Sequence, residues 1–169
     1  MSGPDRFARA RLTVPFGELT VVASDAGVRF VMFGNDAHAR SLAALHVTDD
    51  ASHPVVARTV EQLREYVNGD RRVFDVPLDL QGTEFQVQAW RALSRVPFGE
   101  TASYAQQAAS IGRPTATRAI GAANGRNPVA IVLPCHRIVG ADGSLTGFGG
   151  GLPVKKWLLD HEARVSRRD

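Results

Sequence analysis

Residues 103–124, SYAQQAASIGRPTATRAIGAAN, set the fold of the second half of this 169-residue chain. Ser103 and Gln106 have the spacing of a capping box, which predicts the start of a short helix. Gly112-Arg-Pro-Thr115 predicts its end and a turn, and a second helix is expected over residues 116–124. Two short helices joined in this way are typical of a helix-turn-helix. The small residues of the second helix suit a close approach to a nucleic-acid groove, but they suit close packing between helices equally well.

The segments on either side of this motif complete a mostly helical half. Thr83-Glu-Phe-Gln86 is a further capping box, and the helix that follows is expected to bury its apolar face before Pro97-Phe-Gly99 ends it. The apolar face consists of Phe85, Ala89, Trp90 and Leu93. After the motif we expect a buried strand over residues 129–133, a turn at Asp142-Gly143, a glycine-rich loop over 147–151 and a final helix over 153–162.

The first half predicts a small α/β unit. Apolar runs at residues 12–14, 19–23 and 28–33 are typical of short strands, and residues 73–76 are a further strand candidate. Between them Ser52 is expected to cap a helix that ends at Asn68-Gly69. The predicted fold class is therefore α/β (α+β), with an N-terminal α/β domain over residues 1–81 and a mostly helical domain over 82–169.

Composition limits the class of protein. Residues 1–82 carry 9 Lys and Arg against 11 Asp and Glu, whereas residues 83–169 carry 11 against 6, so the basic surplus lies in the helical half. Such an asymmetry favours a polyanionic partner. One cysteine excludes a disulfide framework. No signal-peptide segment and no membrane-spanning stretch is evident, so we expect a cytoplasmic protein without membrane contact.

The single cysteine lies in Leu133-Pro-Cys-His-Arg-Ile-Val139. A buried structural cysteine usually has apolar neighbours, whereas His136 and Arg137 can both carry positive charge beside Cys135. Positive charge lowers the pKa of a thiol and favours the reactive thiolate. The stretch therefore predicts a nucleophile.

The motif over residues 131–139 resembles the active-site signature of the O6-alkylguanine-DNA alkyltransferases, also called methylated-DNA–protein-cysteine methyltransferases. The resemblance extends through the second half, at residues 82–86, 90, 97–101, 103–104, 118–121, 127–128 and 147–151. The first 80 residues are similar, much more weakly, to the N-terminal domain of that family, which is related to the ribonuclease-H-like fold.

This resemblance implies a role for each residue of a relay. Cys135 attacks the alkyl carbon on O6 of guanine, and His136 deprotonates the thiol through a water. Glu162 orients the histidine, Tyr104 donates to the departing base, and Asn127 supports the turn before the active-site strand. A soft thiolate suits displacement at an sp³ carbon, and a hydrogen-bond donor stabilises the charge that develops on the purine. The thioether product has no evident route back, so one turnover per molecule is expected, without any cofactor.

The resemblance also implies the partner, double-stranded DNA that carries alkylated bases and is bound through the minor groove. The target nucleotide is flipped out, and Arg118 fills the space that it leaves. The DNA-binding residues expected beside Arg118 are Ser103, Thr115, Ala119 and Ala122. A monomer is expected, and the sequence leaves open cooperative binding along DNA, the preferred alkyl group and activity on O4-alkylthymine.

The substrate pocket implied by the resemblance consists of Trp90, Val132, Pro134, Phe148, Gly149 and Gly150. Phe148 and Gly149 stand where some relatives have Tyr and Ser, so a hydroxyl contact to the base is expected to be missing. Ala130 stands where some relatives have Pro, which favours bulkier alkyl groups. No metal site is expected, and His38, His46 and His53 are interpreted as surface residues.

Three other functions are compatible with parts of the sequence. A thiol hydrolase could use Cys135, His136 and Glu162, although adjacent residues on a strand face opposite ways. A relative that binds alkylated DNA without transfer commonly replaces the cysteine by Trp, and this chain retains it. A plain helix-turn-helix regulator would leave the thiol unexplained.

Overall fold

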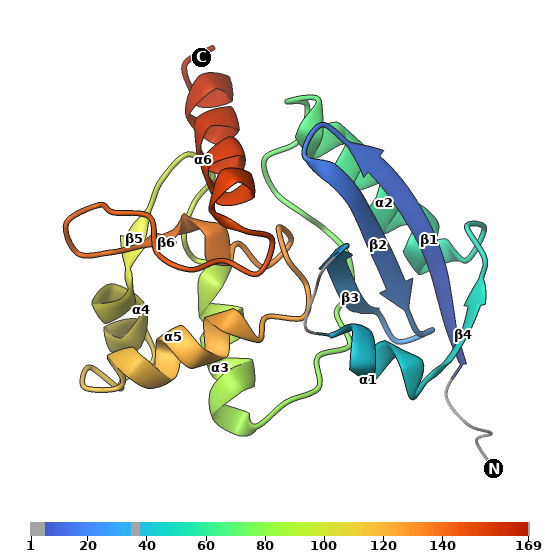
Figure 1. Cartoon of the computed structure of the whole chain (residues 1–169), viewed down its shortest axis with the longest axis horizontal. Helices are drawn as coiled ribbons and strands as arrows, with labels where there is room; N and C mark the ends of the chain where they lie inside the picture. The colour runs from blue at the N-terminus through green and yellow to red at the C-terminus, as the bar shows by residue number, and fades with distance from the viewer. Residues whose placement is uncertain (1–5, 35–37, 169) are drawn as a thin grey trace. The chain divides into compact units, whose positions relative to one another are not determined.

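The computed structural model describes residues 6–34 and 38–168, and the chain divides into two units, Met1–Leu80 and Gln81–Asp169 (Figure 1). The predicted α/β class is confirmed. A four-stranded sheet forms the basis of the first unit, and the second unit is mostly helical.

The sheet of the first unit has the order β3-β2-β1-β4. β1 pairs antiparallel with β2, β2 pairs antiparallel with β3, and β1 pairs parallel with β4. The four strands are β1 (Arg6–Val14), β2 (Gly17–Ala23), β3 (Val28–Phe33) and β4 (His46–Asp49). The three predicted strands are confirmed, whereas β4 was not predicted because only one of its four residues, Val47, is apolar.

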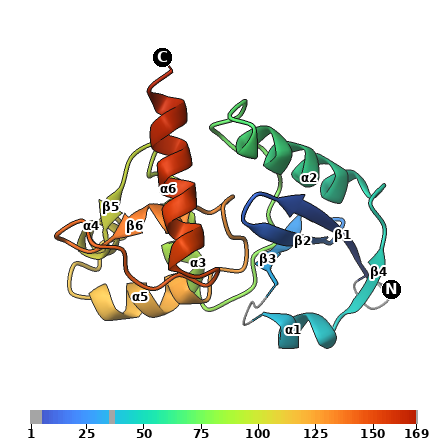
Figure 2. The ribbon, with the colours of Figure 1, turned by 45° about the horizontal axis from the view of Figure 1, so that its top comes forward.

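Helices cover both faces of this sheet (Figure 2). On one face lies α2 (Pro54–Val67), which buries Val56, Val60 and Leu63. On the other lies the short α1 (Ala39–Ala43), over a cluster that includes Phe7 and Phe30.

Two predicted details of the first unit are wrong. The cap of α2 is His53, whose Nδ1 accepts from the Val55 amide at 3.2 Å, while Ser52 bonds to Asp50 instead. Residues 73–76 form no strand, and the Val73 side chain is 73% exposed. The backbone instead meets β3 further on, where Leu78 forms a bridge with Val28.

Three helices lie together in the second unit (Figure 1). They pack around a small apolar cluster. They are α3 (Glu84–Leu93), α4 (Tyr104–Ser110) and α5 (Thr117–Gly125), and the cluster consists of Ala89, Ala108, Ile120 and Ala123. Both predicted capping boxes are confirmed, since each N-cap hydroxyl accepts from the N3 amide and the N3 glutamine reaches back. Gly112 at φ +73° makes the turn between α4 and α5.

A two-stranded parallel sheet joins the helix pair to the cysteine. β5 (Ala102–Ser103) leads directly into α4, and β6 (Ile138–Val139) follows a 3₁₀ turn, η1 (Cys135–Arg137). Because β5 and β6 lie side by side, the start of α4 and the residues of η1 are held close together, and Tyr104 and Cys135 line the same cavity. The final helix, α6 (Leu152–Ser166), is longer than predicted and packs against η1.

The segment over residues 129–133 is a buried tight turn, not the predicted strand. The Leu133 amide donates to the Val129 carbonyl at 3.0 Å, and Ile131 adopts a left-handed φ of +72°. An apolar run predicts burial, but it cannot distinguish a strand from a buried turn that side-chain hydrogen bonds stabilise.

No helix in the described parts of the chain combines the length and apolar character needed to cross a lipid bilayer.

Candidate active site

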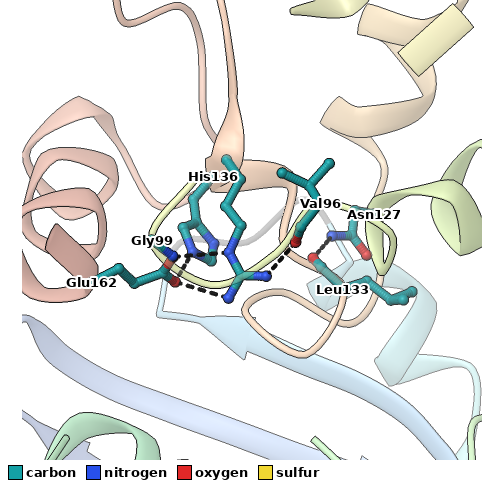
Figure 3. Close-up of polar contacts among 7 residues, drawn as sticks. Val96, Gly99, Asn127, Leu133, His136 and Glu162 are labelled. Atoms are coloured by element: carbon teal, nitrogen blue, oxygen red, sulfur yellow. Dashed lines mark hydrogen bonds and ion pairs between the residues drawn. The ribbon is translucent and has the colours of Figure 1, made fainter. Parts of the chain in front are cut away.

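Asn127 holds the turn that precedes the cysteine. Its side-chain Nδ2 donates to the Leu133 carbonyl at 2.8 Å (Figure 3). Its Oδ1 accepts from the Val129 amide at 3.0 Å. The residue is buried, so both bonds lie away from solvent. This clamp compensates for the unfavourable φ of Ile131 and sets where Cys135 begins the 3₁₀ turn.

His136 and Glu162 form a fully buried pair. Nε2 of His136 lies 2.6 Å from Oε2 of Glu162, and neither residue is more than 1% exposed (Figure 3). The histidine comes from η1 and the glutamate from α6, 26 residues further on. The structure thus brings together the two residues that the sequence assigned to one relay.

Glu162 is surrounded by donors. Besides His136 it accepts from the Gly99 amide at 3.1 Å and from two nitrogens of Arg137, at 2.9 and 3.1 Å. Burial alone would raise the pKa of Glu162, but the hydrogen bonds and charges of His136 and Arg137 outweigh burial and lower it to about 2. The carboxylate is therefore ionised at neutral pH and acts only as an acceptor.

The Glu162 carboxylate determines which tautomer His136 adopts. Burial lowers the pKa of His136, more than the contact with Glu162 raises it, so the neutral imidazole is favoured at neutral pH. Since Glu162 can only accept, Nε2 carries the hydrogen, and Nδ1 is the basic nitrogen. Within the described residues, Nδ1 is buried and has no hydrogen-bond partner in the protein. Thiol activation requires a base that can reach the thiol, either directly or through one water.

Gly99 permits this arrangement. Its φ of +82° suits glycine, and a Cβ there would clash with Oγ of Ser166. The sequence Pro97-Phe-Gly99 predicts only a helix break, and its amide contact with Glu162 could not be recognised from that pattern.

The cations near the thiol differ from the sequence interpretation. Arg137 does not serve the thiol directly, because its buried guanidinium binds Glu162 and the Val96 carbonyl, the latter at 2.7 Å. Lys155 of α6 is a second buried cation, and it interacts electrostatically with Cys135. Its ammonium is buried and donates to the carbonyls of Ile138, at 2.6 Å, and Thr146, at 3.3 Å. Burial lowers the pKa of Lys155, and the charge of Cys135 opposes that effect.

A cavity of about 350 Å³ opens at Cys135. Its wall consists of Tyr104, Gly121, Asn124, Gly125, Cys135, Gly147, Phe148 and Gly149. Tyr104, Phe148 and Gly149 were predicted near the substrate, whereas the other predicted pocket residues, Trp90, Val132, Pro134 and Gly150, do not line this cavity. Trp90 is a core residue that ties α3 to α5, because its Nε1 donates to the Ala123 carbonyl at 2.7 Å.

Asn124 is a wall residue that sequence reasoning missed. It forms a reciprocal amide pair with Gln107 of α4, with N···O distances of 2.9 and 2.8 Å, and Gln107 also donates to the Ala89 carbonyl of α3. These bonds connect the three helices behind the cavity. The sequence carried no signal for them, because a helical Gln or Asn is ordinarily a surface residue.

The outer side of α5 presents the predicted DNA-binding residues to solvent. Arg118, Ala119 and Ala122 are exposed, as is Thr115 in the turn before the helix. Ser103 is half-buried and caps α4, so its hydroxyl already accepts from the Gln106 amide at 3.1 Å. Gly121 and Gly125 lie on the same helix face as Arg118 and also line the cavity, so the exposed face of α5 borders the cavity that contains Cys135.

The histidines interpreted as surface residues have varied surroundings. His53 caps α2 and contacts Asp25 at 2.8 Å, the His38 ring makes a tilted contact with the ring of Phe30, and His46 is exposed on β4. No group of three or more His, Cys, Asp or Glu in the described ranges could hold a metal ion.

One unit thus contains a thiol that lines a cavity, a neutral histidine held by an ionised carboxylate, and a helix-turn-helix surface. Together they are typical of proteins that bring a thiol nucleophile to DNA.

Comparisons with known proteins agree with this class. The family described as "6-O-methylguanine DNA methyltransferase, DNA binding domain" matches residues 84–164, and its "ribonuclease-like domain" matches residues 10–80. The chain belongs to this methyltransferase family.

Curated relatives carry the name methylated-DNA–protein-cysteine methyltransferase. One from Mycolicibacterium paratuberculosis is 56% identical over 65% of this chain and 67% of its own length. The constitutive protein from Bacillus subtilis is 37% identical over 92% of this chain and 94% of its own length.

Among solved structures, Mycobacterium tuberculosis OGT in complex with DNA superposes with a TM-score of 0.84 at 40% identity. The superposition covers 95% of this chain and 94% of that one.

Proposed function

We propose that this protein repairs DNA by transferring the alkyl group of O6-alkylguanine to Sγ of Cys135, as a methylated-DNA–protein-cysteine S-methyltransferase. One observation carries the proposal: Cys135 opens onto a cavity, beside a histidine whose basic nitrogen is Nδ1. Membership of the methyltransferase family supports the same reaction.

The chemical step follows from these groups. Nδ1 of His136 takes the thiol proton, through a water in the relay that the family resemblance implies, and Glu162 stabilises the imidazolium that forms. Sγ then forms a bond to the alkyl carbon as the carbon–oxygen bond breaks, and its electron pair passes to the purine. Tyr104 donates to the departing base, which finally takes up a proton equivalent to the one that the thiol lost.

The product is a thioether, and no group in the described cavity wall can cleave it. One protein molecule therefore repairs one base. Because a reactive thiol must stay reduced until it meets a lesion, we propose a reducing, cytoplasmic setting.

DNA is the partner that the family supports, and we propose a monomer that binds the minor groove through α5. The exposed small residues beside Arg118 allow a close backbone approach, and the single long side chain enters the base stack when the damaged nucleotide turns toward Cys135. Weak sequence readout in that groove suits repair at arbitrary positions.

The test is mass spectrometry after incubation with a duplex that contains O6-methylguanine. The peptide that contains Cys135 should gain one methylene group, with the amount of product limited to one equivalent of protein. Cys135→Ser should bind the duplex without gaining mass. Turnover beyond one equivalent, or a modified residue other than Cys135, would refute the proposal. The same assay with O4-methylthymine decides whether that base is also a substrate.

A further inference from the structure

The hydroxyl group of Tyr104 is in contact with the hydroxyl group of Thr146. Oη of Tyr104 lies 2.5 Å from Oγ1 of Thr146, which joins the start of α4 to the glycine-rich segment of the cavity wall. We infer that Thr146 is a positioning residue: its hydroxyl donates to Oη of Tyr104 and so directs the tyrosine hydrogen toward the departing base. The inference rests on the proposed function, in which Tyr104 is the donor to the purine.

The direction of this hydrogen bond follows from counting hydrogens. A tyrosine hydroxyl carries one hydrogen, and it can accept through its oxygen at the same time. If Tyr104 gave its hydrogen to Thr146, nothing would remain for the purine. With a base in the cavity, the contact persists only if Thr146 is the donor. Donation to Oη also strengthens the tyrosine as a donor, because linked hydrogen bonds polarise one another.

The backbone of Thr146 is held by a hydrogen bond to its carbonyl group. The buried ammonium of Lys155 donates to the Thr146 carbonyl at 3.3 Å and to the Ile138 carbonyl at 2.6 Å. These two bonds tie the residue to α6 and to β6. A Cβ added at the neighbouring Gly147 or Gly149 would meet no atom within 4 Å, so nothing packs against these glycines there. Thr146 is thus an anchored point next to an unpacked glycine segment.

The experiment compares single-turnover transfer rates for duplex O6-methylguanine in the full chain. Thr146→Val keeps the shape but removes the donor, and we expect transfer to be about three- to tenfold slower, the range for one neutral hydrogen bond. Thr146→Ser retains the hydroxyl and should restore most of the rate. Thr13→Val, at an exposed position of β1, is the matched control and should transfer at the parental rate.

Two further measurements separate positioning of Tyr104 from a general effect on the site. Iodoacetamide alkylates the single cysteine with loss of iodide, which needs no hydrogen-bond donor, so Thr146→Val should react with it at the parental rate. In a Tyr104→Phe background, Thr146→Val should have no further effect on transfer.

Three results would overturn the inference: parental transfer by Thr146→Val, an equal slowing toward iodoacetamide, or an undiminished effect in the Tyr104→Phe background. Failure of the proposed function is seen separately, since the parent would then gain no methylene on Cys135. In that case the inference falls with it.

Discussion

Glu162→Gln tests the relay most directly. The carboxylate receives four donors, two on each oxygen: the Gly99 amide and Nε of Arg137 on one, and Nε2 of His136 and Nη2 of Arg137 on the other. Glutamine offers one oxygen and one NH₂ group. If the oxygen serves Gly99, the NH₂ group faces His136, which must then carry its hydrogen on Nδ1. Nδ1 of His136 would then no longer be a base.

The expected magnitudes differ for rate and stability. Loss of a general base lowers the transfer rate by about 10²- to 10⁴-fold. Removing the charge also leaves the Arg137 guanidinium buried without its counter-ion, which costs about 3–5 kcal/mol in the free energy of unfolding. Domains have only about 5–15 kcal/mol of stability, so a large drop in the denaturation midpoint should accompany the slow transfer.

A double variant separates the two effects. Glu162→Gln combined with Arg137→Gln removes the unpaired charge, so stability should recover while transfer stays slow. The assays are urea denaturation and single-turnover transfer as a function of pH. If the double variant also regained the transfer rate, or if the rate–pH profile of Glu162→Gln overlaid that of the parent, then Glu162 would act through the fold and not through His136.

Three further perturbations address the relay and the DNA surface. Because the pKa of His136 is lowered from 6.5, the base stays neutral and transfer should decline only below pH 6.5; a midpoint above 6.5 would contradict this. Protons bind the unfolded chain more readily at both His136 and Glu162, so the free energy of unfolding, from urea titrations, should fall below pH 6.5 and again between 4.5 and about 2. Arg118→Ala should slow repair of duplex DNA about tenfold or more but leave attack on free O6-benzylguanine near the parental rate, since only the duplex requires flipping; equal losses would refute intercalation. Asn127→Ala removes two buried hydrogen bonds and should cost about 2–5 kcal/mol of stability by urea denaturation, whereas an unchanged midpoint would show that the turn around Ile131 holds without the clamp.

Much of this fold could be predicted from the sequence, because its helix caps, turns and strands depend on interactions between neighbouring residues. The capping boxes at Thr83 and Ser103 act within four residues, and Gly112 ends a helix through its own backbone freedom, so neither needs the rest of the chain. The apolar runs that form the first three strands are local signals as well. The class of fold, the helix pair and the candidate nucleophile Cys135 followed from such patterns, although the roles assigned to the site residues stay predictions.

Which side chains meet depends on tertiary packing. The apolar run at residues 129–133 predicts a strand but forms a buried turn, because its conformation depends on Asn127 and not on the run itself. The sequence places Arg137 beside the thiol, yet Arg137 binds Glu162, and the lysine that interacts with the thiol comes from α6. The contact of Tyr104 with Thr146 spans 42 residues.

Helix caps and turns are encoded within a few neighbouring residues, whereas a buried ion pair or a cavity wall exists only after distant segments have packed. For that reason helices α2 to α6, the first three strands and the candidate nucleophile can be read from the chain alone. The side chains around Cys135, and the pocket that it lines, come from the packing of η1, α4, α5 and α6.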